Sequence, residues 1–63
     1  MTILFQDENE EVLFRTEEGI APNVGESINI ENKWYKVVER VYRYKRLNYM
    51  DDNTCYISVE EEQ

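Results

Sequence analysis

The fold of this protein depends on one stretch, Lys33–Leu47, which has the sequence KWYKVVERVYRYKRL. Valine, tyrosine and tryptophan recur in it, and all three favour strands over helices. Alternation places three of its apolar side chains on the inner face: Tyr35, Val37 and Val41. The alternation fails at Glu39, so we predict a β-bulge or sharp bend near Glu39–Val41.

An α-helix is the alternative structure for this stretch. Positions 34, 37, 38, 41, 44 and 45 would form one helical face that only Lys45 interrupts. No serine, threonine, aspartate or glycine directly precedes the stretch to cap a helix, and the segments on both sides are typical of hairpin turns. We therefore favour a long bent strand and keep the helix as the alternative.

Shorter strand-forming segments surround this stretch. We expect them at residues 2–6, 11–16, 26–30 and 54–59. Polar residues predict a hairpin tip at 7–10, and tight turns at Glu31-Asn32 and at Asp51-Asp52-Asn53. Both glycines and the only proline fall in residues 17–25, which we expect to form one long loop.

These elements predict an all-β fold, a small five-stranded SH3-like barrel built as a meander with one long bent strand. A barrel suits a short chain because closure removes exposed strand edges. The 63 residues make a single domain, 1–63, with a solvated acidic tail at 60–63. The expected core consists of Ile3, Phe5, Val12, Phe14, Ile28, Ile30, Tyr35, Val37, Val41, Cys55, Ile57 and Val59.

The composition argues against an enzyme. Histidine is absent, which removes the commonest general base and metal ligand. Cys55 alternates with Ile57 and Val59, so we interpret it as a core residue and not a nucleophile. Asp51-Asp52-Asn53 lacks the spacing of a calcium loop. We expect no catalytic residue, no metal and no cofactor.

The sequence also bears on location. The longest apolar runs have three residues, far short of the about 20 that a membrane-spanning helix needs. The first residues lack the basic and apolar regions of a secretory signal. A lone cysteine cannot form an internal disulfide. We therefore expect a cytoplasmic protein that does not contact membranes.

Charge is distributed unevenly along the chain. Residues 33–46 have a net charge of +5, the other residues have −12, and the total is −7. In a structural interpretation, the outward cations face acids on neighbouring strands, such as Glu11, Glu26 and Glu31. In a functional one, a patch rich in Tyr and Arg contacts an unidentified protein partner. The residues we assign to this partner-binding patch are Trp34, Lys36, Arg40, Tyr42, Tyr44 and Arg46.

We therefore expect a non-enzymatic protein–protein interaction or structural module, for which self-association is possible. The alternative is a nucleic-acid-related protein. Tyr42, Tyr44 and Tyr49 interleave with arginines, as in a surface that stacks bases and binds phosphates. The overall negative charge opposes nucleic-acid binding. The acids could instead mimic DNA and inhibit a DNA-binding host protein, but antiparallel pairing of the first and last strands would split them into two patches.

One part of the chain resembles a known group of proteins. The segment Pro22-Asn23-Val24-Gly25-Glu26-Ser27-Ile28-Asn29-Ile30, followed by Trp34-Tyr35-Lys36-Val37-Val38, is similar to short uncharacterised SH3-like barrel proteins of phages, prophages and other mobile elements. The resemblance covers about residues 20–42. It implies the barrel fold and a phage or mobile-element origin, and it supplies no catalytic residues. The ligand-binding signature of signalling SH3 domains is absent.

Overall fold

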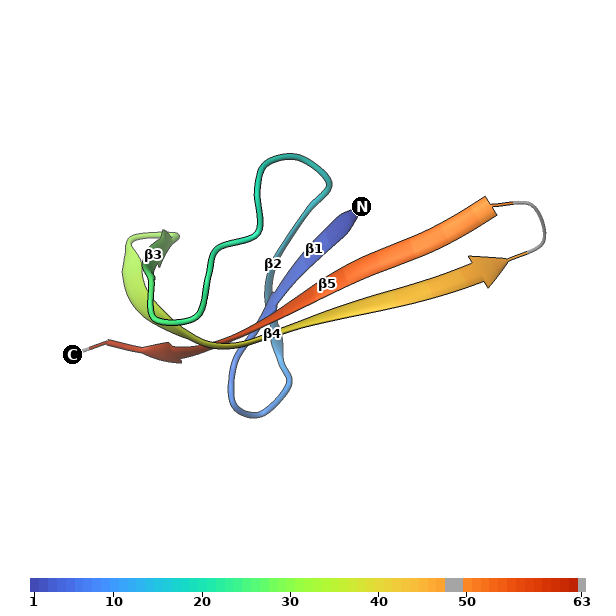
Figure 1. Ribbon diagram of the computed structural model, residues 1–63. Helices are drawn as coiled ribbons and strands as arrows, with labels where there is room; N and C mark the ends of the chain where they lie inside the picture. Colours follow the sequence, from blue (N-terminus) through green and yellow to red (C-terminus); the bar gives the residue numbers. More distant parts are fainter. Residues whose placement is uncertain (48–49, 63) are drawn as a thin grey trace.

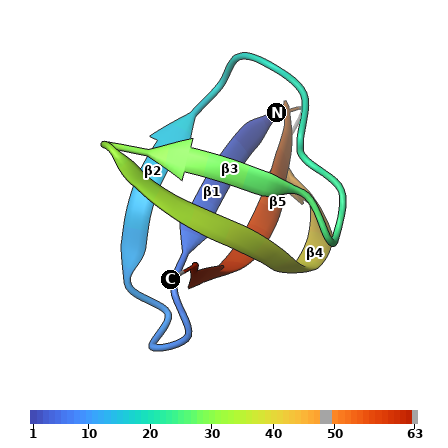
Figure 2. The same ribbon diagram turned by 90° about the vertical axis from the view of Figure 1, so that its left-hand side faces the viewer.

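The computed structural model describes residues 1–47 and 50–62 and is all-β over that part of the chain. Its strands are β1 (Thr2–Gln6), β2 (Val12–Thr16), β3 (Ser27–Ile30), β4 (Lys33–Leu47) and β5 (Met50–Glu61). They form one sheet in the order β2-β1-β5-β4-β3 that curls into a nearly closed barrel (Figures 1 and 2). The predicted small five-stranded barrel is confirmed, and the helical alternative for Lys33–Leu47 is wrong.

The sheet joins the first strand to the last. The pairs β1–β2, β3–β4 and β4–β5 are antiparallel, whereas β1 and β5 are parallel. Thr2 lies opposite Thr54, and Gln6 lies opposite Ser58. In the described part of the chain no pairing joins β2 to β3, so these two strands are the edges of the sheet.

Two strands match the predicted bounds, and one is longer than expected. β1 and β4 cover residues 2–6 and 33–47 as predicted, and the bulge we expected occurs between Val37 and Glu39. β5 is longer because Asp51-Asp52-Asn53 pairs with β4 instead of forming a turn. The register sets Lys45 against Asp52 and Arg46 against Asp51. Glu60 and Glu61 of the expected tail also belong to β5.

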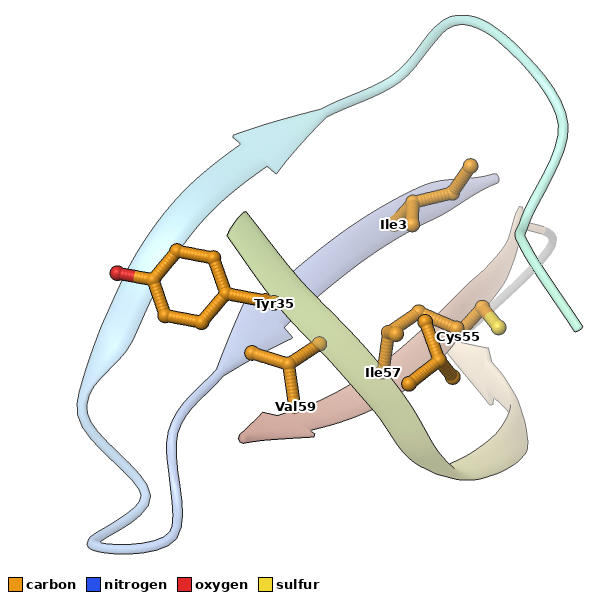
Figure 3. Close-up of a cluster of buried hydrophobic side chains, with 6 residues drawn as sticks. Ile3, Tyr35, Cys55, Ile57 and Val59 are labelled. Carbon is orange, nitrogen blue, oxygen red and sulfur yellow. The ribbon is translucent and has the colours of Figure 1, made fainter. Parts of the chain in front are cut away.

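Apolar side chains from three strands form the core (Figure 3). The buried residues are Ile3, Tyr35, Val37, Cys55, Ile57 and Val59. Partly buried side chains pack against them: Phe5, Leu13, Ala21, Ile28 and Ile30. Nine of the twelve expected core residues are therefore in the core or against it.

The other three expected core residues are exposed, and each has a local cause. The bulge in β4 turns Val41 outward, opposite Tyr56. A second register shift, between Phe5 and Gln6, gives β2 an extra residue, so Leu13 packs on the core and Val12 does not. Phe14 shares the inner face with its partner Phe5, but no strand covers it.

Both predicted short turns in the first half of the chain are present. At the β1–β2 turn, the carboxylate oxygen Oδ1 of Asp7 accepts hydrogen bonds from the backbone N–H groups of Asn9 and Glu11, at 2.8 and 3.0 Å. At the β3–β4 turn, Glu31 and Asn32 have φ angles of +49° and +69°. Two consecutive positive φ angles are typical of the type I′ turn, whose twist matches that of a hairpin.

The molecule is elongated, with extents of 44 × 19 × 19 Å. β1 begins opposite Thr54, which is itself paired with Arg43. Beyond this pair β4 and β5 continue as a two-stranded ribbon, which we call the arm (Figure 1). The arm carries the C-terminal part of the basic stretch away from the barrel.

Candidate interaction surfaces

The bulge in β4 divides the predicted partner-binding patch between two faces of the sheet. Residues directly opposite each other in an antiparallel pair share a face. Before the bulge Val37 lies opposite Val59 in the core, so its neighbours Trp34 and Lys36 face outward. After the bulge Arg40 lies opposite Ile57, and Tyr42 lies opposite Cys55. The inner face of the barrel thus continues along β4 through polar and aromatic residues.

Three of the predicted residues form one continuous surface, which we call the Arg–Tyr ladder: Arg40, Tyr42 and Tyr44. The guanidinium carbon of Arg40 is 5.3 Å from the ring centroid of Tyr42, within cation–π range. The rings of Tyr42 and Tyr44 are stacked, with centroids 6.3 Å apart and planes 13° apart. Tyr42 is 41% exposed and Tyr44 is 70% exposed. The ladder is therefore ordered by its own contacts and open to solvent.

The long loop between β2 and β3 holds the base of the ladder. Arg40 Nη1 donates a hydrogen bond to the side-chain oxygen of Asn23, at 2.6 Å. Asn23 is itself fixed, because its backbone N–H donates to a carboxylate oxygen of Glu26. The contact joins residues 17 positions apart. It restricts the rotamers of an arginine that would otherwise be free on the surface.

Cys55 lies beneath the ladder and is fully buried. Burial raises the pKa of the thiol above its ordinary value of 9.0, although Arg40 and a hydrogen bond with Tyr42 partly oppose the rise. A reactive cysteine needs a lowered pKa and access to solvent. Cys55 has neither, and it packs as the small core residue that its alternation predicted.

The other predicted patch residues lie elsewhere. Trp34 is 56% exposed on the outer face, and Lys36 lies opposite Ser27 and Glu60 there. The side chain of Arg46 and all of Tyr49 fall outside the described residues. Across the described side chains the one ion pair within 4.0 Å joins Arg15 to Glu17, at 3.3 Å. The expected pairing of β4 cations with Glu11, Glu26 or Glu31 does not occur there.

A second surface escaped the sequence analysis. Where β2 and β3 fail to pair, an apolar groove of about 370 Å³ opens between them. Its walls and floor come from β1, β2, β3 and the long loop: Ile3, Phe5, Phe14, Thr16, Glu18, Ile20, Pro22, Ile28, Asn29 and Ile30. We call it the seam groove. The nearest signal in the sequence was Ile20, an apolar residue in a loop rich in turn-forming residues.

The acidic residues also lie differently from expectation. Their division into two patches assumed antiparallel pairing of the first and last strands. The pairing is parallel, so β5 runs past Gln6 in the direction of the Asp7–Glu11 turn. Figure 2 shows the C-terminal end of β5 at the same end of the barrel as that turn. β5 therefore runs toward the acidic turn and not away from it, although Figure 1 shows the C-terminus displaced from the turn along the length of the molecule.

Comparison with family models, with curated proteins and with solved structures finds no match for this chain. In residues 1–47 and 50–62 no three His, Cys, Asp or Glu side chains are placed to hold a metal ion. The described residues include no helix long and apolar enough to cross a membrane. The surfaces above are therefore interpreted from their own chemistry.

Proposed function

We propose that this protein is a small protein-binding module without catalytic activity of its own, and that the Arg–Tyr ladder is its contact surface. The observation that supports this is the order of the ladder, in which stacking, a cation–π contact and the bond to Asn23 fix two exposed tyrosines and a half-buried arginine. Arginine and tyrosine are enriched among the residues that dominate binding energies.

Order before binding matters for affinity. Immobilising a flexible side chain at an interface costs about 0.5–1.5 kcal/mol. Because the side chains of the ladder are already ordered in the free protein, binding a partner requires less of this loss of conformational entropy. Truncating Tyr42 and Tyr44 together should therefore remove a large share of the binding energy, because hot-spot residues each contribute about 2 kcal/mol or more.

The test compares two variants in a quantitative pull-down from a lysate of the source organism. Tyr42→Ala/Tyr44→Ala removes the aromatic part of the ladder, and Trp34→Ala removes an exposed aromatic residue on the opposite face of the same strand. We expect the proteins captured by wild type to be retained by Trp34→Ala and lost from the double variant. Circular dichroism checks that each variant is folded. Equal capture by folded wild type and double variant would refute the role of the ladder.

A second candidate function is mimicry of DNA by the acidic surface. The parallel pairing of β1 with β5 favours it, because β5 runs toward the acidic β1–β2 turn and not away from it. A mimic should displace DNA from a basic DNA-binding protein and should not bind DNA itself. Titration with single- and double-stranded DNA at low salt separates this case from nucleic-acid binding by the basic strand, for which we expect Kd values of about 10⁻⁴–10⁻⁶ M.

The origin and location expected from the sequence remain part of this proposal. A phage or mobile-element gene coding for a cytoplasmic interaction module is consistent with a small, acidic, disulfide-free domain. The neighbourhood of the gene tests the origin directly. Genes for phage structure, integration or defence beside it would support the proposal, and a housekeeping operon would contradict it.

A further inference from the structure

The seam groove is an incompletely covered part of the barrel core. Phe14 faces inward from β2, opposite Phe5, with the two ring centroids 6.2 Å apart, yet it is 47% exposed. Ile20 is 95% exposed at the same groove. A chain this short leaves two large apolar side chains in water at the one place where its sheet does not close.

The wall on the β2 side begins as an extended strand and continues into the long loop, which bends at residues 17–19. Phe14 and Thr16 of β2 line the groove, and Glu18 and Ile20 of the loop follow them. Side chains of an extended chain alternate between two faces, so Phe14 and Thr16 present one face of β2 to the groove. In the described residues β2 pairs only with β1, which leaves its other backbone edge free for hydrogen bonds.

The net charge of the half of the chain that forms the groove favours a cationic occupant, and Glu18 places a carboxylate in the groove wall itself. Residues 1–32, which supply every lining residue, contain eight carboxylates and one arginine, a net charge of −7. Residues 33–63 contain six acids and six bases, so they are neutral overall. The half of the chain that forms the groove thus carries the whole net charge. A second copy would bring two such surfaces together, which like-charge repulsion opposes.

We propose that the seam groove binds an extended cationic segment of another protein, which adds as a sixth strand to the free edge of β2. Alternate apolar side chains of the segment lie in the groove, and the Lys or Arg side chains between them face the acidic surface. Strand addition of this kind takes its affinity from backbone hydrogen bonds and its specificity from pockets for every second side chain. The inference does not depend on the Arg–Tyr ladder.

The test uses a synthetic peptide of alternating lysine and valine, titrated into the full chain and followed by NMR or calorimetry. We expect saturable binding with shifts in β2 and in residues 17–22. Ile20→Asp should weaken binding about tenfold to a hundredfold, because burying an isoleucine is worth 1.5–3 kcal/mol. Val24→Asp is the matched control, since Val24 is a 60% exposed valine of the same loop that does not line the groove.

Two peptide variants test the strand geometry. In an extended peptide the backbone N–H groups of all valines point to one edge and those of all lysines to the other. N-methylation of one set should abolish binding, and N-methylation of the other set should leave it nearly unchanged. An acidic peptide of alternating glutamate and valine should not bind.

Several results would overturn the inference. Equal effects of Ile20→Asp and Val24→Asp on the affinity for the peptide would show that the groove is not the binding site. Equal effects of the two N-methylated peptides would exclude pairing with β2. A dimer that sediments as such at the titration concentration and buries Ile20 would make a second copy the occupant.

Discussion

Cys55 shows at the scale of one residue how the barrel and the ladder depend on each other. Its thiol is buried in the core, while Arg40 and Tyr42 of the ladder lie next to it. The residue that we predicted to be a core residue and not a nucleophile thus also contacts an interaction surface. A change at this position therefore acts on both the core and the ladder.

The raised pKa of Cys55 predicts a pH dependence of stability. Because burial favours the neutral thiol, the folded state holds its proton to higher pH than the unfolded state does. This contribution to the free energy of unfolding is complete below pH 9.0 and is lost as pH rises through the folded-state pKa. We expect wild type to lose stability relative to Cys55→Ala as pH rises above 9.0, measured by urea unfolding.

A thiol reagent gives an independent check on Cys55. At neutral pH, modification of the native protein should be limited by opening of the structure, and urea should accelerate it strongly. The reagent acting on free cysteine serves as the control. Rapid labelling without urea, or a stability difference between wild type and Cys55→Ala that does not change above pH 9, would contradict the burial of this thiol.

At the scale of the element, the β3–β4 hairpin contains avoidable strain. Glu31 and Asn32 both have positive φ angles, which cost most residues about 1–2 kcal/mol relative to glycine. We expect Asn32→Gly to stabilise the protein by up to about 1 kcal/mol and to raise its Tm by about 4–8 °C, measured by thermal unfolding.

The same substitution at Asn9 is the matched control for this prediction. Asn9 lies in the β1–β2 turn and is not among the residues with positive φ. Glycine there should leave stability unchanged or lower it, because it only adds freedom to the unfolded chain. A gain at Asn9 equal to the gain at Asn32 would show that backbone strain is not the cause.

The strands illustrate what local sequence can and cannot predict. Interrupted alternation at Glu39 was enough to predict a bulge, because parity errors are visible within one segment. It was not enough to place the bulge at Val38. Because of the bulge, Tyr42 shares a face with Cys55, whereas Trp34 lies on the other face. The Arg–Tyr ladder was therefore predicted as residues but not as a surface.

Pairings between distant strands were beyond local prediction. The residues around Thr2 and Thr54 carry no signal that their strands pair in parallel. This pairing joins β1 to β5 in the middle of the sheet and leaves β2 and β3 at its edges. The exposure of Phe14 is a property of the closed sheet and not of its own segment. The seam groove could for this reason be found only in three dimensions.

At the scale of the whole molecule, the net charge of −7 works against compactness. In the part of the chain that the structure describes, a single ion pair, between Arg15 and Glu17, offsets it at close range. Repulsion among exposed carboxylates is screened by salt, with a Debye length of about 10 Å at 0.1 M and about 3 Å at 1 M. Stability should consequently depend on ionic strength.

We expect the Tm to rise as sodium chloride increases from low concentration to about 0.5 M, because screening relieves this repulsion. Glu8→Lys/Glu10→Lys is the matched variant, since both residues are exposed in the β1–β2 turn and the double change leaves a weaker net charge. Its Tm should rise less over the same range. A Tm that falls with salt in wild type would mean that attractive pairs dominate.

The parallel contact between β1 and β5 also sets the order in which the molecule can assemble. Thr2 and its partner Thr54 are 52 positions apart, so β1 is synthesised well before the strand with which it pairs. Until that strand is made, only the hairpins β1–β2 and β3–β4 can form, and isolated hairpins are marginal in water. Such distant pairing slows folding. The nascent chain will therefore keep its apolar β1 and β2 side chains exposed until synthesis has passed β5.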